Sequence, residues 1–157
     1  MNNLSTLTIS PFQPQDQAGV KELILAGLAD HWGQIDPTKN PDLNDISASY
    51  AGATFVVARL NGKIVGTGAL VPRTSDTAEV VRMSVAGDVR RHGIGKSILE
   101  HLLAYAKDTG FRRVILETTD TWTEVIQFYL NAGFRITHYE AGDVYFSFDV
   151  GIGGLTV

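Results

Sequence analysis

The spacing of hydrophobic residues predicts one strand and two helices in the first third of the chain. Leu7 and Ile9 alternate with polar neighbours, which indicates a short first strand. Hydrophobic residues then recur at helical spacing over residues 14–30. Residues 31–44 contain two prolines, so we expect a loop there, leading into a short helix near residues 42–50.

Three hydrophobic segments that follow predict antiparallel strands. They cover residues 54–60, 63–71 and 77–85. Asn61-Gly62 separates the first two segments, and this dipeptide favours a type I′ turn because both of its residues tolerate positive φ. We therefore expect a hairpin at this point and a third strand that extends the same sheet.

The last third of the chain alternates between helical and strand patterns. Helices are expected over residues 95–109 and 124–131. A short buried strand over 114–116 should run parallel to the strand before it through a right-handed crossover. Two closing strands are expected over residues 135–139 and 144–150. The expected fold class is therefore α/β (α+β mixed), with a central mixed, mostly antiparallel sheet and helices on both faces.

Composition and charge narrow the class of protein. A length of 157 residues predicts one domain over residues 1–157, with a flexible, glycine-containing tail over 151–157. The net charge of −4 argues against nucleic acid as a partner. The chain has no cysteine, which excludes disulfides, thiolate nucleophiles and Cys-ligated zinc. The first residues do not resemble a signal peptide and no apolar run is long enough for a membrane span, so we expect a soluble, cytoplasmic protein.

A basic loop with two glycines carries the strongest chemical signal. It lies between the predicted strand that ends at Val85 and the predicted helix that follows. Unpaired N–H groups at a helix N-terminus, close backbone approach at glycine and positive side chains together favour a phosphate group. The loop consists of Arg90, Arg91, His92, Gly93, Ile94, Gly95, Lys96 and Ser97. We expect it to bind a phosphorylated cofactor.

The residues of this loop, taken by themselves, allow three interpretations. A P-loop requires a glycine where this chain has Arg90. A dinucleotide-binding fingerprint requires a third glycine or alanine where Ile98 stands, although Glu117 lies about as far downstream as a ribose-binding acid would. A capping turn with solvated arginines requires no ligand.

Two sequence motifs together resemble one known family. Arg90, Gly93 and Gly95 form the pattern Arg-x-x-Gly-x-Gly directly after a predicted strand. Farther along, the helix Glu124-Val125-Ile126-Gln127-Phe128-Tyr129-Leu130-Asn131 is followed by Ala132-Gly133-Phe134. In this order, with a strand between them, the motifs resemble the GNAT superfamily of acyl-CoA-dependent N-acetyltransferases, chiefly over residues 54–150. The resemblance implies acetyl transfer from acetyl-CoA to a primary amine, either a small molecule or a peptide N-terminus, by direct attack in a ternary complex.

The resemblance also implies where acetyl-CoA lies. Its pyrophosphate would rest on the loop from Arg90 to Ser97. Met83, Ser84 and Val85 would run beside the pantetheine arm, where backbone groups would bind its amides and polarise the acetyl carbonyl. The strand over 114–116 would diverge at this point and open a slot for the thioester.

The implied catalytic residues are a tyrosine and a glutamate. Tyr129 matches the family's tyrosine that protonates the leaving thiolate, although a tyrosine on such a helix can also serve packing alone. Glu79 stands where the family sometimes has the base; the alternative is an ion pair, for which Arg82 is a candidate partner. Glu117 is a second candidate base, expected to point to the opposite face.

Other positions complete the expectations for this site. His31 and Trp32, in the loop after the first helix, are candidates for the acceptor site or for ordinary surface packing. The family often has glycine where this chain has Arg91. It also often has an asparagine that contacts the cofactor arm where this chain has Trp122, so the resemblance does not carry that contact over. The histidines show no metal-ligand spacing, so no metal is expected. An exposed edge near residues 144–150 suggests a homodimer, and a non-catalytic acyl-CoA-binding or sensing module is the alternative function.

Overall fold

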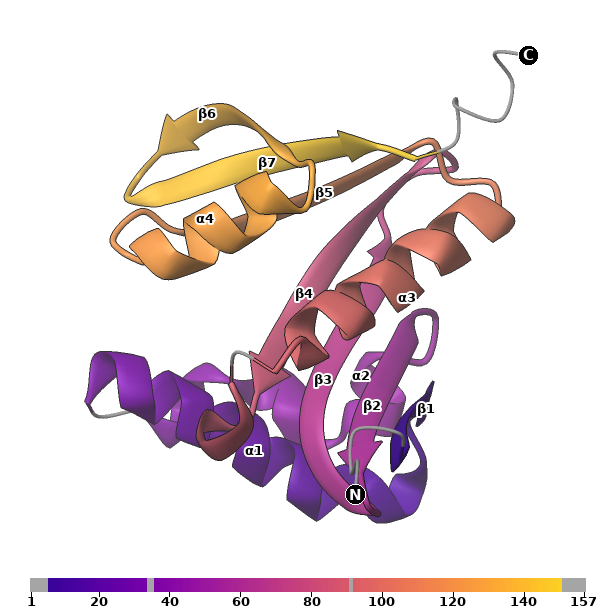
Figure 1. The fold of residues 1–157 in the computed structure, drawn as a ribbon, viewed down its shortest axis with the longest axis vertical. Coiled ribbons are helices and arrows are strands. Elements are labelled where there is room, and N and C mark those ends of the chain that lie inside the picture. Colours follow the sequence, from indigo (N-terminus) through magenta and orange to yellow (C-terminus); the bar gives the residue numbers. More distant parts are fainter. Residues whose placement is uncertain (1–5, 34–35, 91, 151–157) are drawn as a thin grey trace.

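One sheet organises the computed structural model, which describes residues 6–33, 36–90 and 92–150. Within these residues the sheet has seven strands in the spatial order β1-β2-β3-β4-β5-β7-β6 (Figure 1). The strands are β1 (Leu7–Pro11), β2 (Thr54–Leu60), β3 (Lys63–Pro72), β4 (Thr77–Val85), β5 (Arg113–Thr119), β6 (Arg135–Glu140) and β7 (Asp143–Asp149). The expected tail over residues 151–157 lies outside the described residues.

In the described parts of the chain, α-helices and 3₁₀ turns connect these strands. The helices are α1 (Gln17–Trp32), α2 (Ile46–Ser49), α3 (Ile94–Asp108) and α4 (Thr123–Asn131). The 3₁₀ turns are η2 (Pro14–Asp16), η3 (Pro37–Lys39), η4 (Pro41–Asn44) and η5 (Gly87–Val89). None of the helices in the described residues is both long enough and apolar enough to cross a bilayer.

The sheet is mixed and mostly antiparallel, as the sequence predicts. Strands β1 to β4 pair antiparallel in sequence order, and β5 runs parallel to β4. The predicted β2–β3 hairpin is confirmed by positive φ at both turn residues, 55° at Asn61 and 84° at Gly62.

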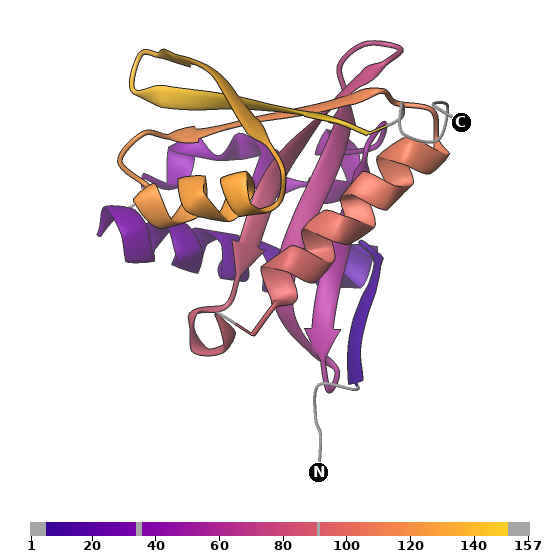
Figure 2. The ribbon, with the colours of Figure 1, turned by 45° about the horizontal axis from the view of Figure 1, so that its top comes forward.

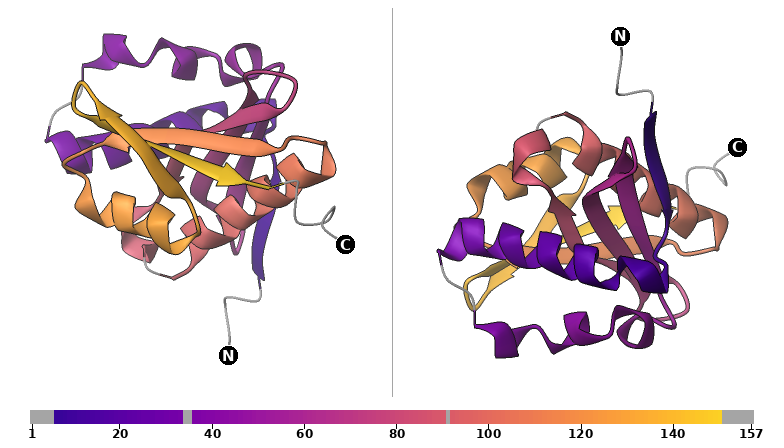
Figure 3. Two further views of the ribbon diagram at one scale, coloured as in Figure 1. Left: turned by 90° about the horizontal axis from the view of Figure 1, so that it is seen from above. Right: turned by 90° about the horizontal axis from the view of Figure 1, so that it is seen from below.

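Helices cover both faces of the sheet (Figures 2 and 3). On one face α1, α2 and η4 enclose a core around Val57 and Ala69, and on the other α3 and α4 enclose a core around Val56 and Ala58. Neighbouring residues of β2 are therefore buried on opposite faces. This explains why its sequence is a continuous hydrophobic run rather than an alternating one.

Strands β4 and β5 pair over a short distance and then diverge. Their parallel register runs only from Thr77↔Arg113 to Glu79↔Ile115. The rest of β4, up to Val85, has no strand partner on this side in the described chain, and Figure 1 shows the two halves of the sheet separating from this point. The predicted divergence of these two strands is confirmed.

Glycines in β3 allow α3 to lie close to the sheet. A Cβ atom at Gly68 would lie 2.7 Å from the Ile98 side chain and 2.8 Å from Met83 Sδ. We predict that Gly68→Ala lowers the free energy of unfolding by about 1–3 kcal/mol, because overpacking forces the helix or its side chains to move. Urea denaturation measures this loss. Gly52→Ala is the matched control, since no atom lies within 4 Å of a Cβ there, and an equal loss in both variants would contradict the packing argument.

Two sequence-based expectations for the fold are wrong. Helix α1 continues through His31 and Trp32 and ends at Gly33, which has a φ of 81°, so these two aromatic residues lie in the last helical turn and not in a loop. Strand β7 is an interior strand between β5 and β6, so the free edge belongs to β6. The expected dimer edge at residues 144–150 is therefore placed on the wrong strand.

Candidate functional site

The glycine loop forms the start of α3. Gly93 is the N-cap with a φ of 81°, a left-handed conformation that favours glycine, and the cap has no side-chain hydrogen bond. The first intrahelical bond at this end is donated by Ser97 N to Gly93 O, at 3.0 Å. The N–H groups of Ile94, Gly95 and Lys96 precede it, so they have no intrahelical partner and point toward a possible anion. The Ile94 side chain is buried, so this residue can contribute only its backbone.

The charged residues of the loop differ in orientation. His92 and Lys96 are exposed and Ser97 is half-buried, whereas Arg91 lies outside the described residues. The Arg90 guanidinium donates from Nε to Val85 O at 3.1 Å, and its Nη2 lies 3.4 Å from Asp30 Oδ2. Arg90 therefore connects the end of β4 to α1.

The segment from Met83 to Val85 is half-buried along the side of β4 that β5 leaves open. Its side chains point to opposite faces. Ser84 Oγ lies 3.1 Å from where a Cβ at Gly27 of α1 would be, whereas Met83 contacts the Gly68 position under α3. Backbone groups, rather than side chains, are therefore what this segment can offer along the open side.

Tyr129 is buried on α4 within a cluster of aromatic rings. Its ring centroid lies 5.0 Å from that of Phe128, 5.7 Å from Phe134 and 5.8 Å from Phe146. Burial raises the pKa of the Tyr129 hydroxyl, so the phenol stays protonated at neutral pH. The neighbouring Phe128 ring and Val85 both lie 3.6 Å from where a Cβ at Gly95 would be. Helix α4, the end of β4 and the start of α3 therefore meet at one place.

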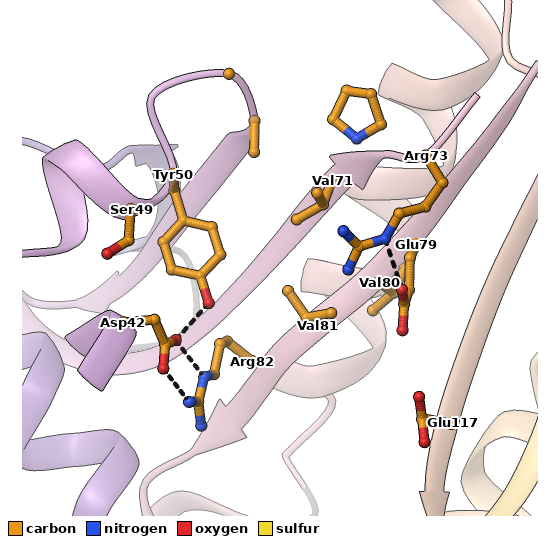
Figure 4. A pocket seen from close by; sticks show the side chains of 13 residues that line it. Asp42, Ser49, Tyr50, Val71, Arg73, Glu79, Val80, Val81, Arg82 and Glu117 are labelled. Carbon is orange, nitrogen blue, oxygen red and sulfur yellow. Dashed lines mark hydrogen bonds and ion pairs between the residues drawn. The ribbon is translucent and has the colours of Figure 1, made fainter. Parts of the chain in front are cut away.

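A pocket of about 850 Å³ lies on the α2 side of β4, beside the divergence from β5 (Figure 4). Its floor is the middle of β4, one wall is the segment around α2, and the far side carries Glu117 from β5. The lining residues are Asp42, Ser49, Tyr50, Gly52, Ala53, Val71, Pro72, Arg73, Glu79, Val80, Val81, Arg82 and Glu117.

A β-bulge directs Arg82 toward the wall of this pocket. The β3–β4 register shifts between Thr67 and Ala69, and Arg82 has a φ of 55°, which is uncommon for a residue with a side chain. Its guanidinium binds both oxygens of Asp42, with Nη2–Oδ1 at 2.7 Å and Nε–Oδ2 at 3.0 Å. The Tyr50 hydroxyl donates to Asp42 Oδ2 at 2.6 Å. These bonds fix the α2 segment against β4 (Figure 4).

The Asp42 carboxylate should make the stability of the fold pH-dependent. Burial opposes its ionisation, but hydrogen bonds from Arg82 and Tyr50 outweigh burial and lower the pKa of Asp42. Its contribution is therefore present above the unfolded pKa of about 3.9 and is lost as the pH falls through the lower folded value. We predict that Asp42→Asn lowers the unfolding free energy by about 1–2 kcal/mol at pH 7. Urea denaturation at several pH values should show the gap to the wild type shrinking below about pH 4; a gap that does not change with pH would contradict this assignment.

The two candidate bases face the same pocket. Glu79 Oε1 accepts from Arg73 Nε at 2.8 Å, so its partner is Arg73 and not Arg82. Glu117 also lines the pocket, so the expectation that it points to the opposite face is wrong. Glu117 is exposed, but partial desolvation raises its pKa, and the nearby Asp143 and Glu79 carboxylates raise it further.

His31 and Trp32 lie away from this pocket, at the end of α1. The His31 ring centroid is 4.1 Å from that of Trp122, the residue before α4, and 4.5 Å from that of Trp32. The structure therefore brings both predicted residues together with Trp122, in a contact between α1 and the start of α4. It does not bring them to the pocket lining.

Sequence reasoning missed Asp42, Tyr50 and Arg73 as parts of the site. Asp42 and Tyr50 lie in the region of residues 42–50, where the pattern predicts only a short helix. Arg73 lies in the turn before β4 and reaches Glu79 across six residues. A charged residue in a turn is ordinary, so only the folded positions reveal this pairing.

Comparison with known proteins gives consistent matches. The model of the acetyltransferase (GNAT) family matches residues 21–134. The probable N-acetyltransferase camello of Xenopus tropicalis is 35% identical over 104 residues, covering 63% of this chain and 48% of that protein. Human N-acetyltransferase 8B is 30% identical over 111 residues, covering 66% and 49%. The chain thus spans about half the length of these two relatives. The uncharacterized N-acetyltransferase YjgM of Escherichia coli is 31% identical over 108 residues, covering 66% and 65%.

Solved structures share the fold at low sequence identity. A GNAT-family acetyltransferase from Staphylococcus aureus Mu50 has a TM-score of 0.83 at 23% identity, covering 92% of this chain and 99% of that one. The PaiA N-acetyltransferase of Thermoplasma acidophilum, solved in complex with coenzyme A, has a TM-score of 0.81 at 17% identity, covering 91% and 98%. A GNAT-family acetyltransferase from Elizabethkingia anophelis, solved with acetyl-CoA bound, has a TM-score of 0.69 at 23% identity, covering 92% and 98%.

Proposed function

This chain belongs to the acetyltransferase (GNAT) family, and we propose that it transfers the acetyl group of acetyl-CoA to a primary amine. The observation that carries the proposal is the divergence of β4 from β5 after Glu79, immediately before the β4 segment that leads to the α3 N-terminus. A slot between two strands and an anion site at the next helix suit a long thioester that ends in phosphates.

We propose that acetyl-CoA binds along this slot. The N–H groups of Ile94, Gly95 and Lys96 would bind the pyrophosphate, with His92, Gly93, Ser97 and the neighbouring arginines Arg90 and Arg91 around it. Arg90 would act by holding the end of β4 through Val85 O. The backbone of Met83 and Val85 would bind the pantetheine amides and stabilise the oxyanion, while Ser84 faces α1.

The proposed reaction moves protons at both ends of the substrate pair. The ammonium first loses a proton to a carboxylate, either Glu79 or Glu117, and the neutral amine then attacks the thioester carbon. As the C–S bond breaks, Tyr129 donates its proton to sulfur, and the phenol is restored by the second proton that leaves the nitrogen. The products are an amide, the free thiol of CoA and one proton released from the carboxylic acid.

The acceptor is proposed to be a small-molecule amine or a peptide N-terminus that enters from the pocket beside α2. This pocket opens on β4 next to the divergence, and Glu79 and Glu117 face into it. A carboxylate-bearing pocket suits a substrate that arrives as a cation. His31 and Trp32 lie outside this pocket, against Trp122, and would contact only an acceptor that extends beyond it.

An amine panel tests this function. The chain is incubated with acetyl-CoA and each amine, and free thiol is measured over time; we expect release that depends on at least one amine. Calorimetry gives the affinity for acetyl-CoA in parallel. Tight binding of acetyl-CoA without thiol release for any amine would contradict transfer and favour the acyl-CoA-sensing alternative. If acetyl-CoA did not bind at all, the proposal that the slot between β4 and β5 holds this cofactor would also be wrong.

A further inference from the structure

We propose that Glu117, rather than Glu79, is the base that removes the proton from the acceptor ammonium. This inference rests on the proposed acetyl transfer and assigns the one proton-accepting group that it leaves open. Both carboxylates line the same pocket, on the neighbouring strands β5 and β4 (Figure 4). Their different surroundings decide between them.

The strand register places Glu117 nearer to the thioester slot. The last β4–β5 pair is Glu79↔Ile115, so Glu79 lies where the strands are still joined. Glu117 is two residues farther along β5, about 7 Å at the usual rise of a strand, on the part that has separated from β4. If the register of the last pair is extended by two residues, Glu117 corresponds to Val81 of β4. Val81 directly precedes the bulge at Arg82 and the segment from Met83 to Val85. An acceptor nitrogen that attacks the thioester would approach this open part.

Glu79 is already engaged with a cation. Its Oε1 accepts from Arg73 Nε at 2.8 Å, and its side chain is only 16% exposed. Because this oxygen is already occupied by the Arg73 guanidinium, it is less available to an incoming ammonium. Glu79 therefore suits attraction of the substrate cation better than proton removal.

Glu117 has the opposite environment. No lysine or arginine pairs with it among the described residues, and the groups that face it are Glu79 from β4 and Asp143 and Tyr145 from β7. Glu117 is an exposed residue, but partial desolvation and the two carboxylates disfavour its charge; Tyr145, directly opposite it on β7, partly offsets them. The other charged residues of the pocket, Arg73 and Arg82, are bound to Glu79 and Asp42. Protonation removes this unfavourable charge. A carboxylate in such surroundings, facing the ammonium of the substrate, has the properties required of a base.

The transfer is balanced as follows. The Glu117 carboxylate takes one proton from the ammonium, which leaves a neutral amine with a lone pair for the C–N bond. The resulting carboxylic acid releases this proton to water through the pocket before the next turnover. No other reactant is required.

The test compares Glu117→Gln, Glu79→Gln and the wild type, using the best amine from the panel. At pH 7 we expect Glu117→Gln to lower kcat/KM by about 100-fold, the lower end for loss of a general base. The defect should shrink toward the wild-type rate as the pH approaches the pKa of the amine, about 10 for an alkylamine and about 8 for a peptide N-terminus, because a large fraction of the amine is then neutral. Glu79→Gln should lower kcat/KM by less, through a higher KM, because Glu79 is expected to attract the substrate cation. Raising the pH should not restore this loss.

Matched measurements separate failure of this inference from failure of the proposed function. Glu100→Gln makes the same chemical change on the exposed face of α3 and controls for the substitution itself. Calorimetry should give the same Kd for acetyl-CoA in all variants. If the wild type acetylates an amine but Glu117→Gln matches it at every pH, or if only the Glu79→Gln defect is repaired at high pH, the assignment of Glu117 is wrong. A wild type without turnover would instead overturn the proposed function.

Discussion

Replacing Tyr129 by phenylalanine should lower kcat by about 100-fold to 10,000-fold, the usual contribution of a general acid, and leave the Kd for acetyl-CoA unchanged. The physical reason is that only the hydroxyl is lost. The ring packs against Phe128, Phe134 and Phe146, and phenylalanine preserves these contacts. Burial is the only influence of the described residues on the pKa of the hydroxyl and no hydrogen bond to it contributes, so its removal leaves no partner unsatisfied. Steady-state thiol release and calorimetry provide the two measurements.

Tyr139→Phe is the control for this substitution. Tyr139 lies on the edge strand β6 and is 62% exposed, so loss of its hydroxyl should change neither kcat nor Kd. Equal turnover by Tyr129→Phe and the wild type would mean that Tyr129 serves packing alone. A parallel loss of acetyl-CoA affinity would mean that the hydroxyl binds the cofactor instead of protonating the thiolate.

Introducing glutamate at Gly93 should weaken acetyl-CoA binding by about tenfold or more relative to glutamine at the same position. Both side chains pay the same cost for the positive φ of 81° at this N-cap. Only glutamate sets a negative charge beside the N–H groups of Ile94, Gly95 and Lys96, where the pyrophosphate is proposed to bind. A tenfold change corresponds to about 1.4 kcal/mol, which is within the range of charge interactions at a helix N-terminus.

The comparison of the two Gly93 variants separates binding from folding. A carboxylate near a helix N-terminus stabilises the unliganded helix, so Gly93→Glu should unfold no more easily than Gly93→Gln. Thermal unfolding checks this expectation, and calorimetric titration with acetyl-CoA gives the two Kd values. Equal Kd values in the two variants would show that the phosphates lie elsewhere.

The sequence predicts those parts of the molecule that depend on local conformation. The Asn61-Gly62 turn and the glycine start of α3 follow from residues that tolerate positive φ. The divergence of β4 from β5 was implied only by family resemblance, because the strand pattern of each continues beyond the last pair at Glu79, with Val80, Val81, Met83 and Val85 in β4. The hydrophobic pattern predicts each strand by itself, but it does not predict how far that strand pairs with its neighbour.

The wall of the pocket depends on contacts between distant residues. A bulge at Arg82 adds one residue without disturbing the hydrophobic pattern of β4, and its partner Asp42 is 40 positions away. Nothing in the sequence joins these two residues. The contact between His31 and Trp122 joins residues still farther apart in the sequence, which is why the sequence placed His31 in an acceptor loop and not against α4.

The order of the closing strands could have been read from composition. Strand β7 is rich in buried residues such as Val144 and Phe146, whereas nearly every residue of β6 is exposed or half-exposed. A strand buried on its faces belongs inside a sheet, and the polar strand belongs at the edge. The expectation of a dimer edge at β7 ignored this difference.

Acetyl transfer itself is tested most directly by following the acetyl group. The chain is supplied with isotopically labelled acetyl-CoA and the best amine from the panel, and mass spectrometry measures the labelled amide while free thiol is assayed in the same sample. We expect labelled amide and thiol in equal amounts, with both reduced together in Tyr129→Phe. Binding of acetyl-CoA with no labelled amide for any amine, or thiol release by hydrolysis alone, would contradict it.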